Sequence, residues 1–101
     1  KDAVISAMDV KSVYAVPLVF AEQKVDEKIL EIFRIDAPAR DMSRWSDMIH
    51  RLENPRDQVD IGLVGKYVEY EDSYKSLKEA LIHGALAHDL KVNFHWIEAQ
   101  D

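Results

Sequence analysis

The sequence VDIGLVGKY, residues 59–67, is a short apolar run that is rich in β-branched residues and contains a glycine near its end. This pattern is typical of a strand buried on both faces, as strands of parallel sheets are. Helix-forming residues follow at 74–88, and a second apolar run occupies residues 92–97. A strand, a helix and a strand at this spacing form a βαβ unit. The sequence therefore predicts an α/β fold with parallel strands.

Composition and charge exclude several classes of protein. The formal net charge of −6 argues against non-specific binding to nucleic acid, which needs clustered Lys and Arg. The longest apolar run is too short to span a bilayer, and no signal pattern opens the chain. The absence of cysteine excludes disulfides, thiolate metal sites and a cysteine nucleophile within these 101 residues. We expect neither a nucleic-acid partner nor a membrane partner, and a cytoplasmic location.

The two ends of the chain suggest a longer protein. The chain begins at Lys1 rather than at a methionine, and it stops just after the second expected strand. A βαβ unit has two unpaired sheet edges and needs further strands. We therefore expect this chain to be a piece of a larger molecule.

Three helices are expected before the first strand. Pro17 suits the first turn of one, and Asp26 is expected to be the N-cap of the next. Asp41 and Ser43 compete for the cap of the third, which the polar residues 54–57 terminate. The apolar faces are formed by Val25, Ile29, Ile32 and Phe33 in the second helix and by Trp45, Met48, Ile49 and Leu52 in the third.

The expected helix between the strands carries two notable features. Asp72 or Ser73 is expected to cap it, since acidic and hydroxyl groups there suit the helix dipole. Gly84 lies in its interior, where glycine costs up to about 1 kcal/mol relative to alanine. A close approach of the helix to the sheet would explain this glycine.

The stretch from Gly62 to Lys66 does not form a phosphate loop. That loop needs GxxxxGK followed by Ser or Thr, whereas here the two glycines are three residues apart and Tyr67 follows the lysine. Two interpretations remain for the end of this strand. Gly65 lets the chain turn, or this edge of the sheet faces a ligand crevice where Lys66 serves an anion; we favour the turn.

The histidines and Asp9 are the other polar residues with a possible functional role. The four histidines show no metal spacing, and His83 and His88 lie on different helix faces, so packing or surface roles are expected. Asp9 follows the expected end of a strand at residues 3–6. It is either a turn residue, as aspartate commonly is, or a group that reads a base edge.

As a set, several motifs resemble the CTP synthase family over essentially the whole chain. The combination of VGKY and DSYKS at this spacing is specific. The matching segments are residues 4–14 (VISAMDVKSVY), 16–18 (VPL), 43–52 around Trp45, 61–67 (IGLVGKY), 72–76 (DSYKS), 79–81 (EAL), 92–93 (VN) and 96–97 (WI).

The resemblance implies an ATP-dependent ligase that converts UTP to CTP. In this family a synthetase domain phosphorylates the uracil 4-oxygen, and a glutaminase domain hydrolyses glutamine and supplies ammonia inside the protein. The resemblance also implies that ATP and Mg²⁺ are cofactors, that GTP is an allosteric activator, and that the complete enzyme assembles as a homotetramer. The chain lacks the family's phosphate loop, its magnesium carboxylates and its Cys-His-Glu triad, so we expect the isolated piece to be inactive.

One ligand-binding element carries over from the resemblance. Met8, Asp9 and Val10 match the family position that lies against the ATP adenine, and no residue matches a catalytic or metal-binding position. The implied division is the end of the synthetase (amidoligase) domain at 1–24, a helical interdomain linker at 25–57, and the first βαβ of a flavodoxin-like glutaminase domain at 58–101.

Two alternatives remain beside this interpretation. One is a free-standing, non-catalytic α/β interaction module. The other is a different glutamine amidotransferase, against which the Asp9-Val10 segment and the linker speak.

Overall fold

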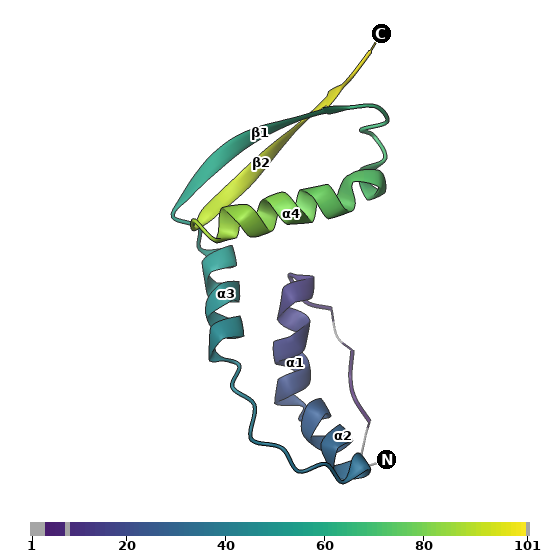
Figure 1. Cartoon of the computed structure of the whole chain (residues 1–101), viewed down its shortest axis with the longest axis vertical. Coiled ribbons are helices and arrows are strands. Elements are labelled where there is room, and N and C mark those ends of the chain that lie inside the picture. Colours follow the sequence, from purple (N-terminus) through teal and green to yellow (C-terminus); the bar gives the residue numbers. More distant parts are fainter. Residues whose placement is uncertain (1–3, 8, 101) are drawn as a thin grey trace. The chain divides into compact units, whose positions relative to one another are not determined.

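The computed structural model of this chain describes residues 4–7 and 9–100. The chain folds as two compact units, Lys1–Ile49 and His50–Asp101. The elements in chain order are η1 (Val13–Ala15), α1 (Val16–Glu22), α2 (Val25–Phe33), α3 (Ser43–Glu53), β1 (Asp57–Gly65), η2 (Glu71–Tyr74), α4 (Lys75–Leu86) and β2 (Leu90–Glu98). Figure 1 labels the α-helices and the strands.

The second unit is built on a parallel pair of strands. β1 and β2 form a two-stranded sheet, and α4 connects them and runs along the pair (Figure 1). The register pairs Asp57 with Leu90 at one end and Gly65 with Glu98 at the other. The predicted α/β fold and its βαβ unit are confirmed. That the complete domain is flavodoxin-like stays a prediction.

Aromatic rings fill the space between α4 and the sheet. The centroid of the Trp96 ring lies 5.8 Å from that of Tyr74 and 6.0 Å from that of Phe94. The ammonium of Lys78 lies 5.8 Å from the centroid of the Phe94 ring. Because side chains alternate between the faces of a strand, Phe94 and Trp96 share the face that α4 covers. Trp96 thus anchors this side of the sheet.

The opposite face of the sheet is polar where the strands begin. The amide of Asn93 donates to Gln58 Oε1 at 3.1 Å, and His95 Nε2 lies 3.1 Å from Asp60 Oδ1. The hydrogen bond with His95 holds the pKa of the Asp60 carboxyl below its usual range. Near the end of β1, Val64 is 69% exposed. In the described part of the chain this face is therefore open to solvent.

An ion pair joins the end of α3 to the turn between α4 and β2. Arg51 Nε lies 2.6 Å from Asp89 Oδ1, and its Nη2 donates to the carbonyl of Leu86 at 3.1 Å. Asp89 has a left-handed backbone with φ 58°, and its carbonyl accepts from the amide of Arg56 at 2.8 Å. The hydrogen bond with Arg51 holds the pKa of the Asp89 carboxyl below its usual range. Both the side chain and the backbone carbonyl of Asp89 thus fix this turn.

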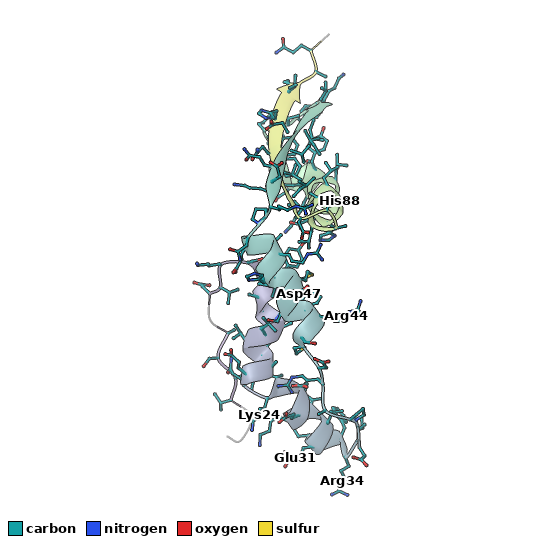
Figure 2. All side chains as sticks on the ribbon, turned by 90° about the vertical axis from the view of Figure 1, so that its left-hand side faces the viewer. Lys24, Glu31, Arg34, Arg44, Asp47 and His88 are labelled. Atoms are coloured by element: carbon teal, nitrogen blue, oxygen red, sulfur yellow. The ribbon has the colours of Figure 1, made fainter. Side chains whose placement is uncertain are left out.

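The short helices of the first unit begin and end differently from one another. Pro17 lies in the first turn of α1, as predicted. α2 is flanked by Lys24 and Arg34, which Figure 2 labels at its two ends and which both have a left-handed backbone. The N-cap of α2 is Lys24, so the prediction of Asp26 as the cap is wrong. Asp26 lies in the first turn instead, where its charge still suits the helix dipole.

The start of α3 is held by a carboxylate and a tryptophan. Asp41 Oδ1 accepts a hydrogen bond from the amide of Ser43 at 2.9 Å, and this contact with Ser43 lowers the pKa of the Asp41 carboxyl. Of the two predicted caps, Asp41 makes the contact. Trp45 Nε1 donates to the carbonyl of Tyr14 at 2.7 Å, which ties α3 to η1.

Two expectations about α4 are wrong. Asp72 and Ser73 do not cap it, because residues 71–74 form the 3-10 turn η2 and the N-cap is Tyr74, which makes no side-chain cap hydrogen bond. A Cβ placed on Gly84 would meet nothing within 4 Å among the described residues. The helix therefore does not approach the sheet at this glycine.

The buried core of the described residues is small. Among the residues whose burial is described, only Ile49 and Ala85 are buried apolar residues, while Phe33 is 70% exposed on the apolar face of α2. The free energy gained by burying so little apolar surface does not offset the conformational entropy lost on folding. The small core therefore also disfavours the alternative of a free-standing module.

We therefore expect the isolated 101 residues to lack a sharp cooperative thermal transition or to self-associate, because exposed apolar residues and strand edges are left uncovered. Calorimetry and analytical ultracentrifugation over a range of concentrations would measure both properties. A strictly monomeric chain with a sharp transition would contradict the expectation.

Candidate functional site

The first candidate site is the segment before η1. Among the described residues, 4–7 are not part of a strand, so the short strand expected there is not found. Gln23 fixes this segment, because its side chain accepts from the Ser6 amide and donates to the Ser6 carbonyl, both at 2.8 Å. Ser12 caps η1 by accepting from the amide of Tyr14 at 3.2 Å. The stretch between is thus held at both ends.

Two of the predicted adenine-binding residues, Asp9 and Val10, lie between these two fixed points. Asp9 is exposed and Val10 is half-buried, and both are in irregular backbone. Met8, the third residue of the prediction, lies outside the described residues. Ser12 and not Asp9 caps η1, and no hydrogen bond joins the Asp9 carboxylate to another described residue. Its two oxygens therefore remain available to a ligand.

The second candidate site is the loop that leaves the end of β1. The carboxylate of Glu98 accepts two hydrogen bonds from this loop, from the amide of Tyr67 to Oε1 and from the amide of Val68 to Oε2, each at 3.1 Å. The hydroxyl of Tyr74 donates to the carbonyl of Lys66. The loop is therefore fixed by β2 on one side and by the turn before α4 on the other.

Gly65 has a different role from the predicted one. No glycine of the described chain has a positive φ; the left-handed residue of this turn is Tyr67, with φ 59°. A Cβ on Gly65 would lie 2.8 Å from the hydroxyl oxygen of Tyr74. The glycine is therefore needed for the close approach of Tyr74 rather than for its own backbone freedom.

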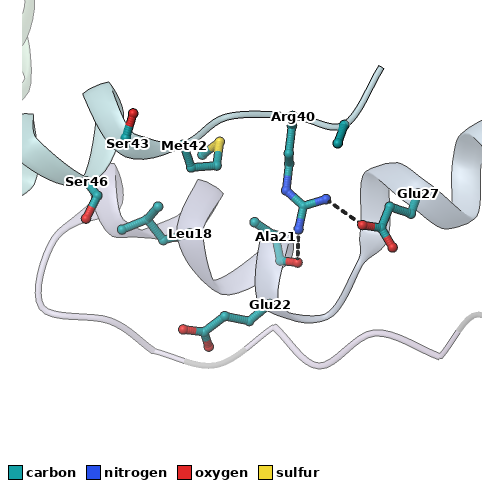
Figure 3. Close-up of a pocket in the computed structure, with 9 residues that line it drawn as sticks. Leu18, Ala21, Glu22, Glu27, Arg40, Met42, Ser43 and Ser46 are labelled. Atoms are coloured by element: carbon teal, nitrogen blue, oxygen red, sulfur yellow. Dashed lines mark hydrogen bonds and ion pairs between the residues drawn. The ribbon is translucent and has the colours of Figure 1, made fainter. Parts of the chain in front are cut away.

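The third feature is a cluster of charges around Arg40. Its Nη1 lies 2.8 Å from both carboxylate oxygens of Asp26 and 3.2 Å from Glu27 Oε1, while its Nη2 donates to the carbonyl of Ala21. Figure 3 shows the guanidinium between Ala21 and Glu27. The hydrogen bond with Asp26 is the main cause of a raised pKa of Arg40. Sequence analysis missed this cluster, because no local pattern links Arg40 to Asp26 and Glu27.

A shallow pocket lies beside Arg40. Its volume is about 520 Å³, and its walls are both polar and apolar. Because all the charged groups in the cluster are paired with one another, Arg40 clamps α1 to α2 and does not offer a free charge to a ligand. The lining residues are Leu18, Ala21, Glu22, Glu27, Ala39, Arg40, Met42, Ser43 and Ser46.

The described residues offer no metal site and no membrane-crossing helix. Nowhere in residues 4–7 and 9–100 do three or more His, Cys, Asp or Glu side chains gather in a way that could hold a metal ion. Over the same residues, no helix has both the length and the apolar character that crossing a bilayer requires.

Comparison with known proteins relates the chain to one kind of enzyme. No protein-family model matches it. It is 59% identical over 99 residues to the CTP synthase of Koribacter versatilis (strain Ellin345), covering 98% of this chain and 18% of that protein. It is 58% identical over 98 residues to the CTP synthase of Acidobacterium capsulatum, covering 97% of this chain and 18% of that protein.

A third relative is less similar but equally complete in its match. The CTP synthase of Rhizorhabdus wittichii (strain DSM 6014 / CCUG 31198 / JCM 15750 / NBRC 105917 / EY 4224 / RW1) is 50% identical over 100 residues, covering 98% of this chain. The chain spans 18% of the length of each of these three relatives. By sequence, this chain belongs to the CTP synthase family and corresponds to one segment of its members.

Proposed function

We propose that this chain is part of a cytoplasmic ligase of pyrimidine biosynthesis that aminates UTP to CTP at the expense of ATP, with ammonia from glutamine hydrolysis. The observation that carries the proposal is the match of 98% of the chain to an enzyme with the name CTP synthase, at 59% identity. An identity of this level along both compact units argues against a chance match to one motif.

The division of labour along the chain is part of the proposal. Residues 1–24 end the synthetase domain, residues 25–57 form the linker, and residues 58–101 open the glutaminase domain. The parallel β1–α4–β2 unit supports the last assignment, because open α/β sheets bind ligands outside the carboxyl ends of their strands. The helices α2 and α3 support the assignment of a helical linker.

Within the synthetase part, Asp9 and the backbone of Val10, together with Met8, lie against the ATP adenine. The exposed Asp9 carboxylate supports this role, since an acceptor can bind the adenine amino group. The described residues do not fit a magnesium site, as they hold no cluster of three or more ligands. We assign the binding of Mg²⁺ mainly to other parts of the enzyme, and GTP activation and assembly as a homotetramer to the complete protein.

The test is CTP formation by the complete protein in which these residues occur. With UTP and ATP, we expect it to make CTP from either glutamine or ammonia, while the isolated 101 residues do neither and release no ammonia from glutamine. The isolated chain has no cysteine to act as a nucleophile and no phosphate loop. A complete protein that makes no CTP from ammonia would contradict the proposal.

A further inference from the structure

The loop at residues 66–70 leaves β1 at the edge of the sheet where ligands bind in open α/β folds. Its two tyrosine side chains are largely exposed, Tyr67 to 64% and Tyr70 to 61%. The centroids of these two rings lie 6.4 Å apart, and the amide of Tyr70 donates to the carbonyl of Tyr67 at 3.0 Å. The loop is thus a compact turn that presents aromatic groups at this edge.

This turn requires support from outside itself. Tyr67 has a left-handed backbone, which is unfavourable for a residue with a side chain and persists only where neighbouring contacts hold it. The carboxylate of Glu98 supplies these contacts, because each of its oxygens accepts one of the two consecutive amides, Tyr67 and Val68. Hydrogen bonds from amides to an ionised carboxylate are stronger than those between neutral groups.

The position of Glu98 suits it to couple the two strands to the loop. It is the last residue of β2, paired in register with Gly65, and the following residue, Ala99, donates its amide to the carbonyl of Gly65 at 2.7 Å. Any shift of β2 along β1 would therefore move the carboxylate away from the loop amides. The loop takes its shape from the strand beside it and not from its own sequence alone.

We propose that Glu98 is a positioning residue for the glutamine half-reaction: by binding the Tyr67 and Val68 amides, it holds the 66–70 loop in the shape that glutamine hydrolysis requires. This inference rests on the proposed function, because it takes residues 58–101 as the start of the glutaminase domain. It assigns Glu98 no contact with the reacting atoms. Ammonia-dependent CTP formation does not require the loop and is independent of Glu98.

The test uses the complete enzyme and the variants Glu98→Gln and Glu98→Asp. Glutamine keeps one acceptor oxygen but directs an NH₂ group at the second amide, so kcat for glutamine hydrolysis should fall about fivefold or more. Ammonia-dependent CTP formation should stay within about twofold of the wild type. Aspartate keeps two acceptor oxygens and should recover part of the lost hydrolysis. Glutamate release measures hydrolysis separately from CTP formation.

Glu53→Gln is the matched control, since it makes the same chemical change at an exposed carboxylate at the end of α3. Unchanged hydrolysis in Glu98→Gln would overturn the inference. A parallel loss of both activities with a lower melting temperature would also overturn it, because Glu98 would then serve only stability. A wild-type enzyme that releases glutamate but makes no CTP from ammonia would contradict the proposed function and not the role of Glu98. In that case the effect of Glu98→Gln on glutamine hydrolysis would still test the role of Glu98.

Discussion

Replacing Gly65 with alanine is expected to destabilise the β1–β2 pair by about 2 kcal/mol, because the added methyl group overpacks a filled site. The new Cβ would lie 2.8 Å from the hydroxyl oxygen of Tyr74 and 3.3 Å from its Cζ. Tyr74 cannot easily move away, since its hydroxyl binds the Lys66 carbonyl and its ring packs on Trp96. Hydrogen exchange of the β1 and β2 amides in the complete protein should accelerate about thirtyfold.

Two further variants isolate the cause of this effect. Gly84→Ala makes the same substitution where the new Cβ meets nothing within 4 Å among the described residues, so it should slow exchange in α4 slightly as a better helix former. Tyr74→Phe removes the hydroxyl, and in that background Gly65→Ala should cost clearly less. An equal cost in both backgrounds would show that contact with the hydroxyl is not the reason for the glycine.

The parallel strands could be predicted from the sequence because their signal is local. A run of apolar, β-branched residues such as 59–64 predicts a strand of a parallel sheet, and the spacing to the next run requires a crossover helix. The expected burial of this strand on both faces is not found among the described residues, since Val64 is 69% exposed. β1 and β2 accordingly form where they were expected, although both begin two residues earlier, at Asp57 and Leu90. Those first residues are fixed by pairing between the strands, which neither run reveals alone.

The features that sequence analysis missed depend on contacts between distant residues. Asp26 matches an N-cap by local rules, yet it binds Arg40, 14 positions away, and the helix begins earlier. The carboxylate of Glu98 binds amides 30 and 31 positions away, and no short motif encodes that contact. Gly65 was predicted to let the chain turn, whereas in the structure it leaves room for the side chain of the distant Tyr74. Local propensity thus located the elements and tertiary contacts determined their ends.

The proposed contact of Asp9 with adenine leads to a prediction about nucleotide selection. A carboxylate or a backbone carbonyl accepts a hydrogen bond from the adenine amino group, whereas guanine presents a carbonyl at the same position. An acceptor that faces this carbonyl is left unpaired, and an unsatisfied polar group in a binding site costs about 1–3 kcal/mol. The exposed and unpaired state of Asp9 in the described chain leaves its carboxylate able to make this contact.

In the complete enzyme, Asp9→Ala should raise the KM for ATP about tenfold or more, since the loss of one charge-assisted hydrogen bond is worth at least about 1.4 kcal/mol. Glutamine hydrolysis should change much less, because the proposed function places that reaction in the glutaminase domain, of which residues 58–101 are only the beginning. Asp36→Ala is the matched control, as Asp36 is also an exposed aspartate in irregular backbone. Initial rates of CTP formation at varied ATP concentration measure the effect. If Asp9→Ala folds normally and keeps the wild-type dependence on ATP, Asp9 is a turn residue, and adenine is read by other groups.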